Sequence, residues 1–230
     1  MKACPALIAA LPREVSALVK GWECRELQGR IVIYTNGHAV VACAGMGEAR
    51  AALAVQAAMD AMPVTALISV GLVGGCDPAL RVGEIVRAGV VIDGRTGERF
   101  ESSGSELKQV LVTEDAIASV SEKSRVRALF GAAAVDMEAV AVARVARARG
   151  LELKAIKAVS DEADFEVGDL SRFSTAEGQF REGAFALHAA LRPALWGKVI
   201  ALGRNSGKAL AALTEALEVE LDWYRKKDAE

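Results

Sequence analysis

The sequence predicts an α/β fold in which helices cover a central sheet. Short apolar runs alternate with alanine-rich stretches of helical composition along the chain, which is typical of strands and helices packed in layers. The run at residues 65–71 is apolar without polar alternation, as expected for a strand buried on both faces. We assign residues 1–190 to one catalytic domain and residues 191–230 to a C-terminal helical extension.

Turn-forming residues separate the expected strands. Asn36-Gly37 lies between two β-prone runs and predicts a hairpin, because both residues tolerate positive φ. Residues 74–78 contain two glycines and a proline and predict a turn, and the polar residues 93–108 predict a solvent-facing loop. Strands are expected at residues 6–10, 31–34, 38–43, 65–71, 84–92, 109–112 and 153–159.

Helices are expected at residues 13–19, from Gly47 to Met62, at 135–149, and from 176 onward with an interruption at 192–193. Gly150 is placed to end the third of these helices. The tail from 195 to 223 spaces its apolar residues by three and four, which predicts an amphipathic helix broken at 203–207. We expect its apolar stripe to pack on the core or at an interface, with a membrane surface as the alternative.

Composition excludes several functional classes. The 230 residues include 28 Lys and Arg against 30 Asp and Glu, a net charge of −2, whereas a nucleic-acid-binding protein normally carries a basic face. No run reaches the roughly 18 apolar residues that a membrane helix needs. Four cysteines without CxxC spacing and two histidines argue against a zinc site or a histidine-based triad. A reducing, cytoplasmic compartment is the default expectation.

Three strand-to-loop junctions carry residues suited to chemistry at the edge of the sheet. Glu14 follows the first strand and is either a helix-dipole partner or a general base acting on water. The glycines of 71–75, and Gly45, form tight turns or let the backbone approach a ligand. Asp161 ends the last buried strand after Ser160, as a helix cap or as a functional acid. Glu138 points toward the same edge, or lies solvated in a first helical turn.

Taken in order, these segments resemble the nucleoside phosphorylase family, and most closely its 5′-methylthioadenosine/S-adenosylhomocysteine nucleosidases. The matching stretches are residues 8–15, 42–49, 68–86, 134–141 and 155–164. The most specific motifs are Val135-Asp136-Met137-Glu138-Ala139 and Val159-Ser160-Asp161-Glu162-Ala163-Asp164. The resemblance implies a three-layer αβα fold with a twisted, mixed and partly closed sheet. It also implies a homodimer or higher homo-oligomer that cleaves purine nucleosides without a metal or cofactor.

The resemblance also implies roles for individual residues. Asp161 matches the acid that protonates purine N7, which stabilises a departing base that gathers negative charge. Glu138 matches the acid that binds the ribose hydroxyls, Met137 the side chain against the sugar, and Glu14 the carboxylate that orients water. Further substrate contacts are expected from Ser160, Gly71, Leu72, Gly45 and Ile117.

Hydrolysis is favoured over phosphorolysis by the residues around the glycine-rich turn. Phosphate needs several positive groups or amide donors, yet Leu67-Ile68-Ser69-Val70 lacks the arginine of phosphate-using members. Arg13 is the basic residue near a matching junction, and Glu14 would repel phosphate. Adenine release from methylthioadenosine or adenosylhomocysteine is therefore the leading expectation.

The chain also departs from the family pattern. Leu72 replaces a serine, Asp136 replaces a glutamate, and Ile117 replaces an aromatic residue that stacks on the base. These departures concern the substrate more than the reaction. The alternatives are a phosphorylase, a nucleosidase for a bulky 5′-substituted nucleoside such as adenosylhopane, a futalosine hydrolase, and an inactive nucleoside-binding module.

Overall fold

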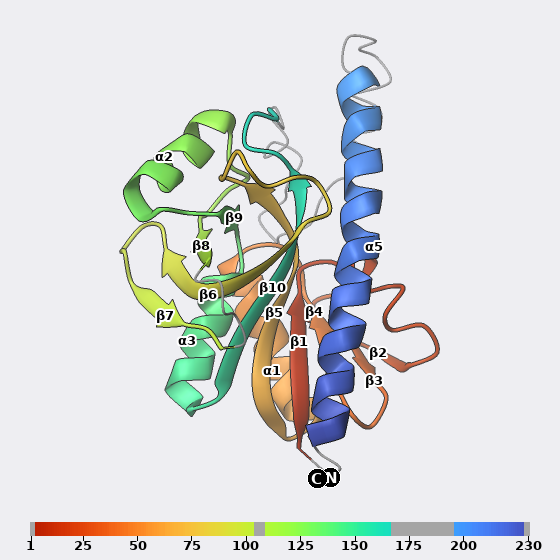
Figure 1. The fold of residues 1–230 in the computed structure, drawn as a ribbon. Helices are drawn as coiled ribbons and strands as arrows, with labels where there is room; N and C mark the ends of the chain where they lie inside the picture. Colours follow the sequence, from red (N-terminus) through yellow and green to blue (C-terminus); the bar gives the residue numbers. More distant parts are fainter. Residues whose placement is uncertain (1–2, 104–108, 167–195, 228–230) are drawn as a thin grey trace.

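The computed structural model describes residues 3–103, 109–166 and 196–227. Their strands form one ten-stranded sheet (Figure 1). The strands are β1 (Cys4–Ala9), β2 (Glu23–Leu27), β3 (Ile31–Thr35), β4 (Val40–Cys43), β5 (Val64–Gly75), β6 (Ile85–Asp93), β7 (Arg99–Glu101), β8 (Gln109–Thr113), β9 (Ala134–Asp136) and β10 (Glu152–Asp161). The helices are the 3₁₀ turn η1 (Pro12–Glu14), α1 (Glu48–Ala61), α2 (Val120–Phe130), α3 (Ala139–Arg149) and α5 (Trp196–Lys227).

The sheet is mixed and partly closed, as predicted. Its order is β10-β6-β8-β9-β5-β1-β4-β3-β2, and β10 also pairs with β5, which closes the first five strands on themselves. The parallel register of β10 on β5 runs from Glu152 opposite Ala66 to Asp161 opposite Gly74. Because β1 is also parallel to β5, the carboxyl ends of these three strands meet at one edge of the sheet.

Side chains alternate between the two faces of the sheet and divide the core into layers. On β1, Ala6 and Ile8 belong to the cluster that contains α1 and α3. Leu7 and Ala9 belong to the cluster on the opposite face, which is covered by α5. Figure 1 shows α5 lying along one face of the sheet, with α1 and α3 behind the other.

The C-terminal helix α5 is continuous, so the break expected at residues 203–207 is wrong. A single glycine inside a helix costs only about 1 kcal/mol, and the buried leucines Leu213, Leu217 and Leu221 hold the helix against the sheet. Glu220 adds ion pairs to Lys154 on β10 and to Arg87 on β6, at 2.6 and 2.8 Å. None of the helices in the described residues combines the length and apolarity needed to cross a bilayer.

Several element predictions are corrected by the structure. The helix expected at 13–19 is only the 3₁₀ turn η1, followed by turns. The helix expected from residue 135 begins at Ala139, because residues 134–136 form strand β9 between β5 and β8. Strand β2, helix α2 and the short strand β7 within the expected loop were not anticipated. The helix expected from 176 and its interruption at 192–193 begin outside the described residues.

Candidate active site

A cavity of about 550 Å³ opens where β1, β5 and β10 end, beside the first half of α5. That volume lies within the range of small-molecule sites. Seven of the predicted site residues line it: Glu14, Leu72, Ile117, Met137, Glu138, Ser160 and Asp161. The remaining lining residues are Ala10, Leu11, Arg13, Met46, Val73, Gly74, Ala116, Ala118, Lys123, Val135, Asp136, Leu202, Gly203, Ser206, Gly207 and Leu210.

The carboxylate of Glu14 is held by three backbone amides. One oxygen, Oε2, accepts hydrogen bonds from the amides of Ala10 and Leu11 at 3.0 and 2.9 Å. The other, Oε1, accepts from the amide of Leu72 at 3.2 Å. The side chain is buried, and each carboxylate oxygen can accept more than one hydrogen bond. Oε1, which accepts from the Leu72 amide, therefore keeps an acceptor site for a water molecule in the cavity.

Gly71 lies behind this carboxylate. Its φ of +132° is one that side chains rarely adopt, and a Cβ there would lie 3.0 Å from Glu14 Oε1. Gly71 is not among the residues that line the cavity, and neither is Gly45, so the structure does not place these two expected contacts at the cavity wall. The amide of Gly45 instead bonds the Ala10 carbonyl at 2.9 Å, which joins the ends of β4 and β1.

Glu138 comes from the junction of β9 and α3, where it is the residue before the first helical turn. Its Oε1 accepts a hydrogen bond from the amide of Gly47 at 2.8 Å, at the start of α1. Burial, reinforced by the negative charge of Asp136, raises the pKa of Glu138 to about 7. Glu138 therefore changes charge near neutrality, unlike an exposed glutamate.

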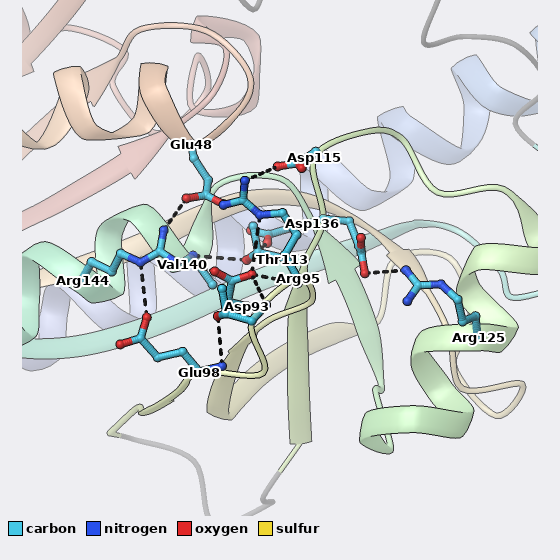
Figure 2. Close-up of polar contacts among 12 residues, drawn as sticks. Glu48, Asp93, Arg95, Glu98, Thr113, Asp115, Arg125, Asp136, Val140 and Arg144 are labelled. Carbon is cyan, nitrogen blue, oxygen red and sulfur yellow. Dashed lines mark hydrogen bonds and ion pairs between the residues drawn. The ribbon is translucent and has the colours of Figure 1, made fainter.

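Two further groups fix the backbone around Glu138 (Figure 2). Asp136 accepts a hydrogen bond from the Thr113 hydroxyl at 2.7 Å and another from the amide of Ala139, which caps α3. Arg144 on α3 binds Glu48 in the first turn of α1, and it also binds Asp93 at the end of β6. These contacts tie α1 to α3, so the Gly47 amide stays in place for Glu138.

Lys157 neutralises part of this acidic cluster. It lies on β10 with its side chain 1% exposed, and its Nζ is 2.8 Å from Asp136 Oδ2. Burial by itself lowers the pKa of Lys157, but the negative charges of Asp136, Glu138 and Glu14 outweigh burial and raise the pKa above its usual value. Lys157 stays a cation and compensates the buried negative charge of Asp136.

Asp161, at the end of β10, pairs with Lys123 of α2. Lys123 Nζ donates to Asp161 Oδ2, and to the carbonyls of Glu162 and Phe165 at 2.9 and 3.2 Å. The Ser160 hydroxyl lies 2.7 Å from the other carboxylate oxygen. Lys123 and Asp161 are both buried and both line the cavity, so a carboxylate and an ammonium face one ligand together.

Lys123, Lys157 and the α5 residues were missed by the sequence reasoning. A signal existed for Lys157, because it interrupts an apolar run that predicts a buried strand. Lys123 gave no such signal, since its partner is 38 residues away in the sequence. The contribution of α5 depends on tertiary packing, which places Leu202, Ser206 and Leu210 on the cavity wall.

The described residues contain no cluster of three or more His, Cys, Asp or Glu side chains that could hold a metal ion. The cations that line the cavity among these residues are Arg13 and Lys123. The donors that hold Glu14 are backbone amides, which are also the groups that bind phosphate in other sites.

A family model described as the phosphorylase superfamily matches residues 6–119 and 104–195. The chain belongs to the phosphorylase superfamily. No curated protein sequence matches the chain. The match confirms the resemblance to this family that the sequence motifs indicate.

Solved structures match this superfamily member over most of its length. A 5′-methylthioadenosine/S-adenosyl homocysteine nucleosidase of Helicobacter pylori is 17% identical, with a TM-score of 0.72 over 96% of this chain and 98% of the other. A futalosine hydrolase mutant of H. pylori strain 26695 is 18% identical, with a TM-score of 0.63 over 74% and 93%. An S-adenosylhomocysteine nucleosidase from Streptococcus pyogenes, in complex with 5-methylthiotubericidin, is 20% identical, with a TM-score of 0.61 over 71% and 87%. At these identities the likeness establishes the fold.

Proposed function

We propose that the protein hydrolyses the N-glycosidic bond of a purine nucleoside, with methylthioadenosine and adenosylhomocysteine as leading substrates. The observation that carries the proposal is the cradle around Glu14, in which three backbone amides hold one carboxylate at the cavity wall. A carboxylate fixed in this way can orient an attacking water and accept its proton. The nucleosidases among the solved structures share this fold.

Water is favoured over phosphate as the nucleophile. Phosphate binding requires amide or cationic donors, and the amides of Ala10, Leu11 and Leu72 are occupied by Glu14. Lys123 is engaged by Asp161. A phosphate at this wall would also meet the negative charge of Glu14. Phosphorolysis, with phosphate bound by Arg13 at the cavity wall, is the alternative reaction.

The remaining acids support cleavage of the glycosidic bond. Asp161 is proposed to protonate purine N7 as the bond to the sugar breaks, because the departing base gathers negative charge. Glu138 is proposed to accept hydrogen bonds from the ribose hydroxyls, with Met137 against the sugar. None of the four cysteines, all of which lie in the described residues, forms a disulfide, which suits the proposed cytoplasmic setting.

The wall that α5 provides supports a second candidate, a nucleoside with a larger 5′ substituent. Leu202 and Leu210 give this wall an apolar character. A Cβ added at Gly203 or Gly207 would meet no atom within 4 Å, so these positions leave open space along the helix. We therefore propose a nucleoside with an apolar 5′ extension, of the adenosylhopane kind, as the second candidate, ahead of futalosine.

Adenine release from a set of nucleosides tests the proposal. Methylthioadenosine, adenosylhomocysteine and an adenosine with a long 5′ alkylthio chain are each incubated with the protein and with Asp161→Asn. We expect adenine from at least one nucleoside, and a loss of about 10²-fold or more in kcat for the variant. Binding of nucleosides without adenine release would instead identify a binding module.

Substitution on α5 separates the two substrate classes. Gly207→Leu fills the open space, so it should slow cleavage of the long alkylthio substrate while leaving methylthioadenosine nearly unaffected. Gly197→Leu is the matched control, because Gly197 is an exposed glycine of the same helix that does not line the cavity. Equal effects of both variants would remove α5 from substrate selection.

A further inference from the structure

The buried ion pair of Lys123 and Asp161 has a geometry that goes beyond stabilising the fold. Lys123 Nζ bonds Asp161 Oδ2 and the carbonyls of Glu162 and Phe165, so all three N–H donors of the ammonium are used. The side chain is 1% exposed. The ammonium therefore connects α2 to Asp161 at the end of β10 and to the turn that follows.

The chain leaves space for the pair at Gly74. A Cβ at this position would lie 3.0 Å from Lys123 Cε and 3.1 Å from Asp161 Oδ2. Both distances are shorter than ordinary van der Waals contact, so a larger residue would press on the acid and on the cation together. Gly74 also lines the cavity, and its lack of a side chain keeps the pair accessible to a ligand there.

The pair raises a question of proton supply. The carboxylate accepts from Lys123 on one oxygen and lies in hydrogen-bond contact with the Ser160 hydroxyl on the other. As the acidic partner of this ion pair, Asp161 carries no proton of its own for the departing base. The Cys76 thiol is close to both groups, but burial raises its pKa to about 12, with Asp161 adding to the effect and Lys123 opposing it. The ammonium of Lys123 already touches the carboxylate.

Direct contact makes the ammonium a suitable source. Lys123 Nζ donates a hydrogen bond to Asp161 Oδ2, so a proton has only one hydrogen bond to cross to reach the carboxylate. A nucleoside in the cavity would displace the remaining water near the pair. The negative charge that develops on the purine then draws the proton through Asp161, which keeps its own negative charge throughout.

We propose that Lys123 is a positioning residue for Asp161 and the source of the proton that Asp161 passes to the leaving base. This inference rests on the proposed function. The C1′–N9 bond breaks with its electron pair moving to the purine, and a proton passes from Lys123 to Asp161 and from Asp161 to N7. Water bonds to C1′ and gives its proton to Glu14. The ammonium ends as an amine, and bulk water then restores both groups.

Two substrates with the same sugar separate proton supply from structural support. The purine nucleoside needs an acid, whereas the corresponding p-nitrophenyl riboside releases a stable phenolate without one. Lys123→Met should lower kcat on the nucleoside by about 100-fold, the scale of general-acid losses, and change kcat on the phenyl riboside by less than about threefold. Lys154→Met is the control, since Lys154 is also a buried lysine but pairs with Glu220 outside the cavity.

Lys123→Arg and a double variant complete the test. Arginine keeps a positive charge beside Asp161 but does not release its proton, so Lys123→Arg should fold and still lose kcat on the nucleoside, even where Lys123→Met fails to fold. Lys123→Met combined with Asp161→Asn should be no slower than Asp161→Asn alone, because the two residues act in series.

The possible results distinguish failure of this inference from failure of the proposed function. An unchanged nucleoside rate in Lys123→Met, an equal loss on both substrates, or wild-type activity in Lys123→Arg would overturn the inference while leaving the proposed hydrolysis intact. A wild-type protein that cleaves neither substrate would contradict the proposed function and this inference with it. Selective loss on the nucleoside in both single variants supports proton supply by Lys123.

Discussion

At the scale of single residues, the three acids of the cavity are distinguished by their partners. Glu14 is held by three amides, Asp161 by an ammonium, and Glu138 by one amide in a negatively charged, buried setting. Carboxyl groups with different surroundings take different protonation states at one pH. The cavity can therefore hold a base, an acid and a sugar-binding group built from the same chemical function.

Glu138→Gln should change the pH dependence of stability. The folded pKa of Glu138 is about 7, against 4.5 for the ordinary group, so between these values the folded state keeps a proton that the unfolded state releases. The free energy of unfolding then falls as pH rises from about 4.5 to about 7, by about 3 kcal/mol, and is level above.

Urea unfolding at pH 5 and pH 8 measures this effect. Glu138→Gln should remove most of the decrease and be more stable than wild type at pH 8. Glu218→Gln is the control, because Glu218 is an exposed carboxylate on α5. A wild-type decrease that persists in Glu138→Gln would show that Glu138 is not its origin.

Gly71→Ala should displace the Glu14 carboxylate. The added Cβ would lie 3.0 Å from Oε1 and would adopt a φ of +132°, a conformation that costs about 1–3 kcal/mol for most residues. We expect lower stability together with a large fall in kcat.

Gly97→Ala provides the comparison for Gly71→Ala. Gly97 also has a positive φ, of +74°, but a Cβ there meets no atom within 4 Å. This variant should lose stability through backbone strain and keep its kcat. Equal kcat for the two variants, measured on the best nucleoside, would argue against a role for Glu14 position in the reaction.

At the scale of elements, α5 both stabilises the sheet and shapes the cavity. Leu213, Leu217 and Leu221 are buried against one face of the sheet, while Leu202 and Leu210 line the cavity one to three turns earlier. The same helix thus anchors itself through its second half and presents its first half to the ligand.

Leu213→Ala should destabilise the protein by about 3 kcal/mol, because it removes a fully buried side chain and leaves a cavity between α5 and the sheet. Val219→Ala, on the exposed side of the same helix, should change stability by less than about 0.5 kcal/mol. Chemical denaturation measures both changes. A similar, small effect of the two substitutions would contradict the packing of α5 described here.

At the scale of the whole molecule, the sequence predicts the strands better than the connections. The apolar run at residues 65–71 predicts β5, because a strand buried on both faces has no polar positions. Helix α2 is missed because it buries only Lys123 and Val126, too few residues to form an apolar stripe. Strand β9, with three residues, is too short to be distinguished from the helix that follows.

The candidate site shows the same division. Glu14 and Asp161 follow recognisable strand ends, and Glu138 lies near a recognisable helix start, so their meeting at one edge is predictable from sequence. Lys123 and the wall formed by α5 reach the cavity only through tertiary packing, which no local pattern encodes. Gly71 and Gly74 were expected to approach a ligand. Gly71 makes room for Glu14, and Gly74, which lines the cavity, makes room for the Lys123–Asp161 pair.

The central claim is that Glu14, held by three amides, directs water rather than phosphate at the sugar. The most direct measurement identifies the sugar released with adenine from methylthioadenosine, in buffers with and without phosphate, for wild type and Glu14→Gln. We predict free methylthioribose at a rate independent of phosphate, and a loss of that rate in Glu14→Gln. A sugar phosphate formed only when phosphate is present would contradict the claim.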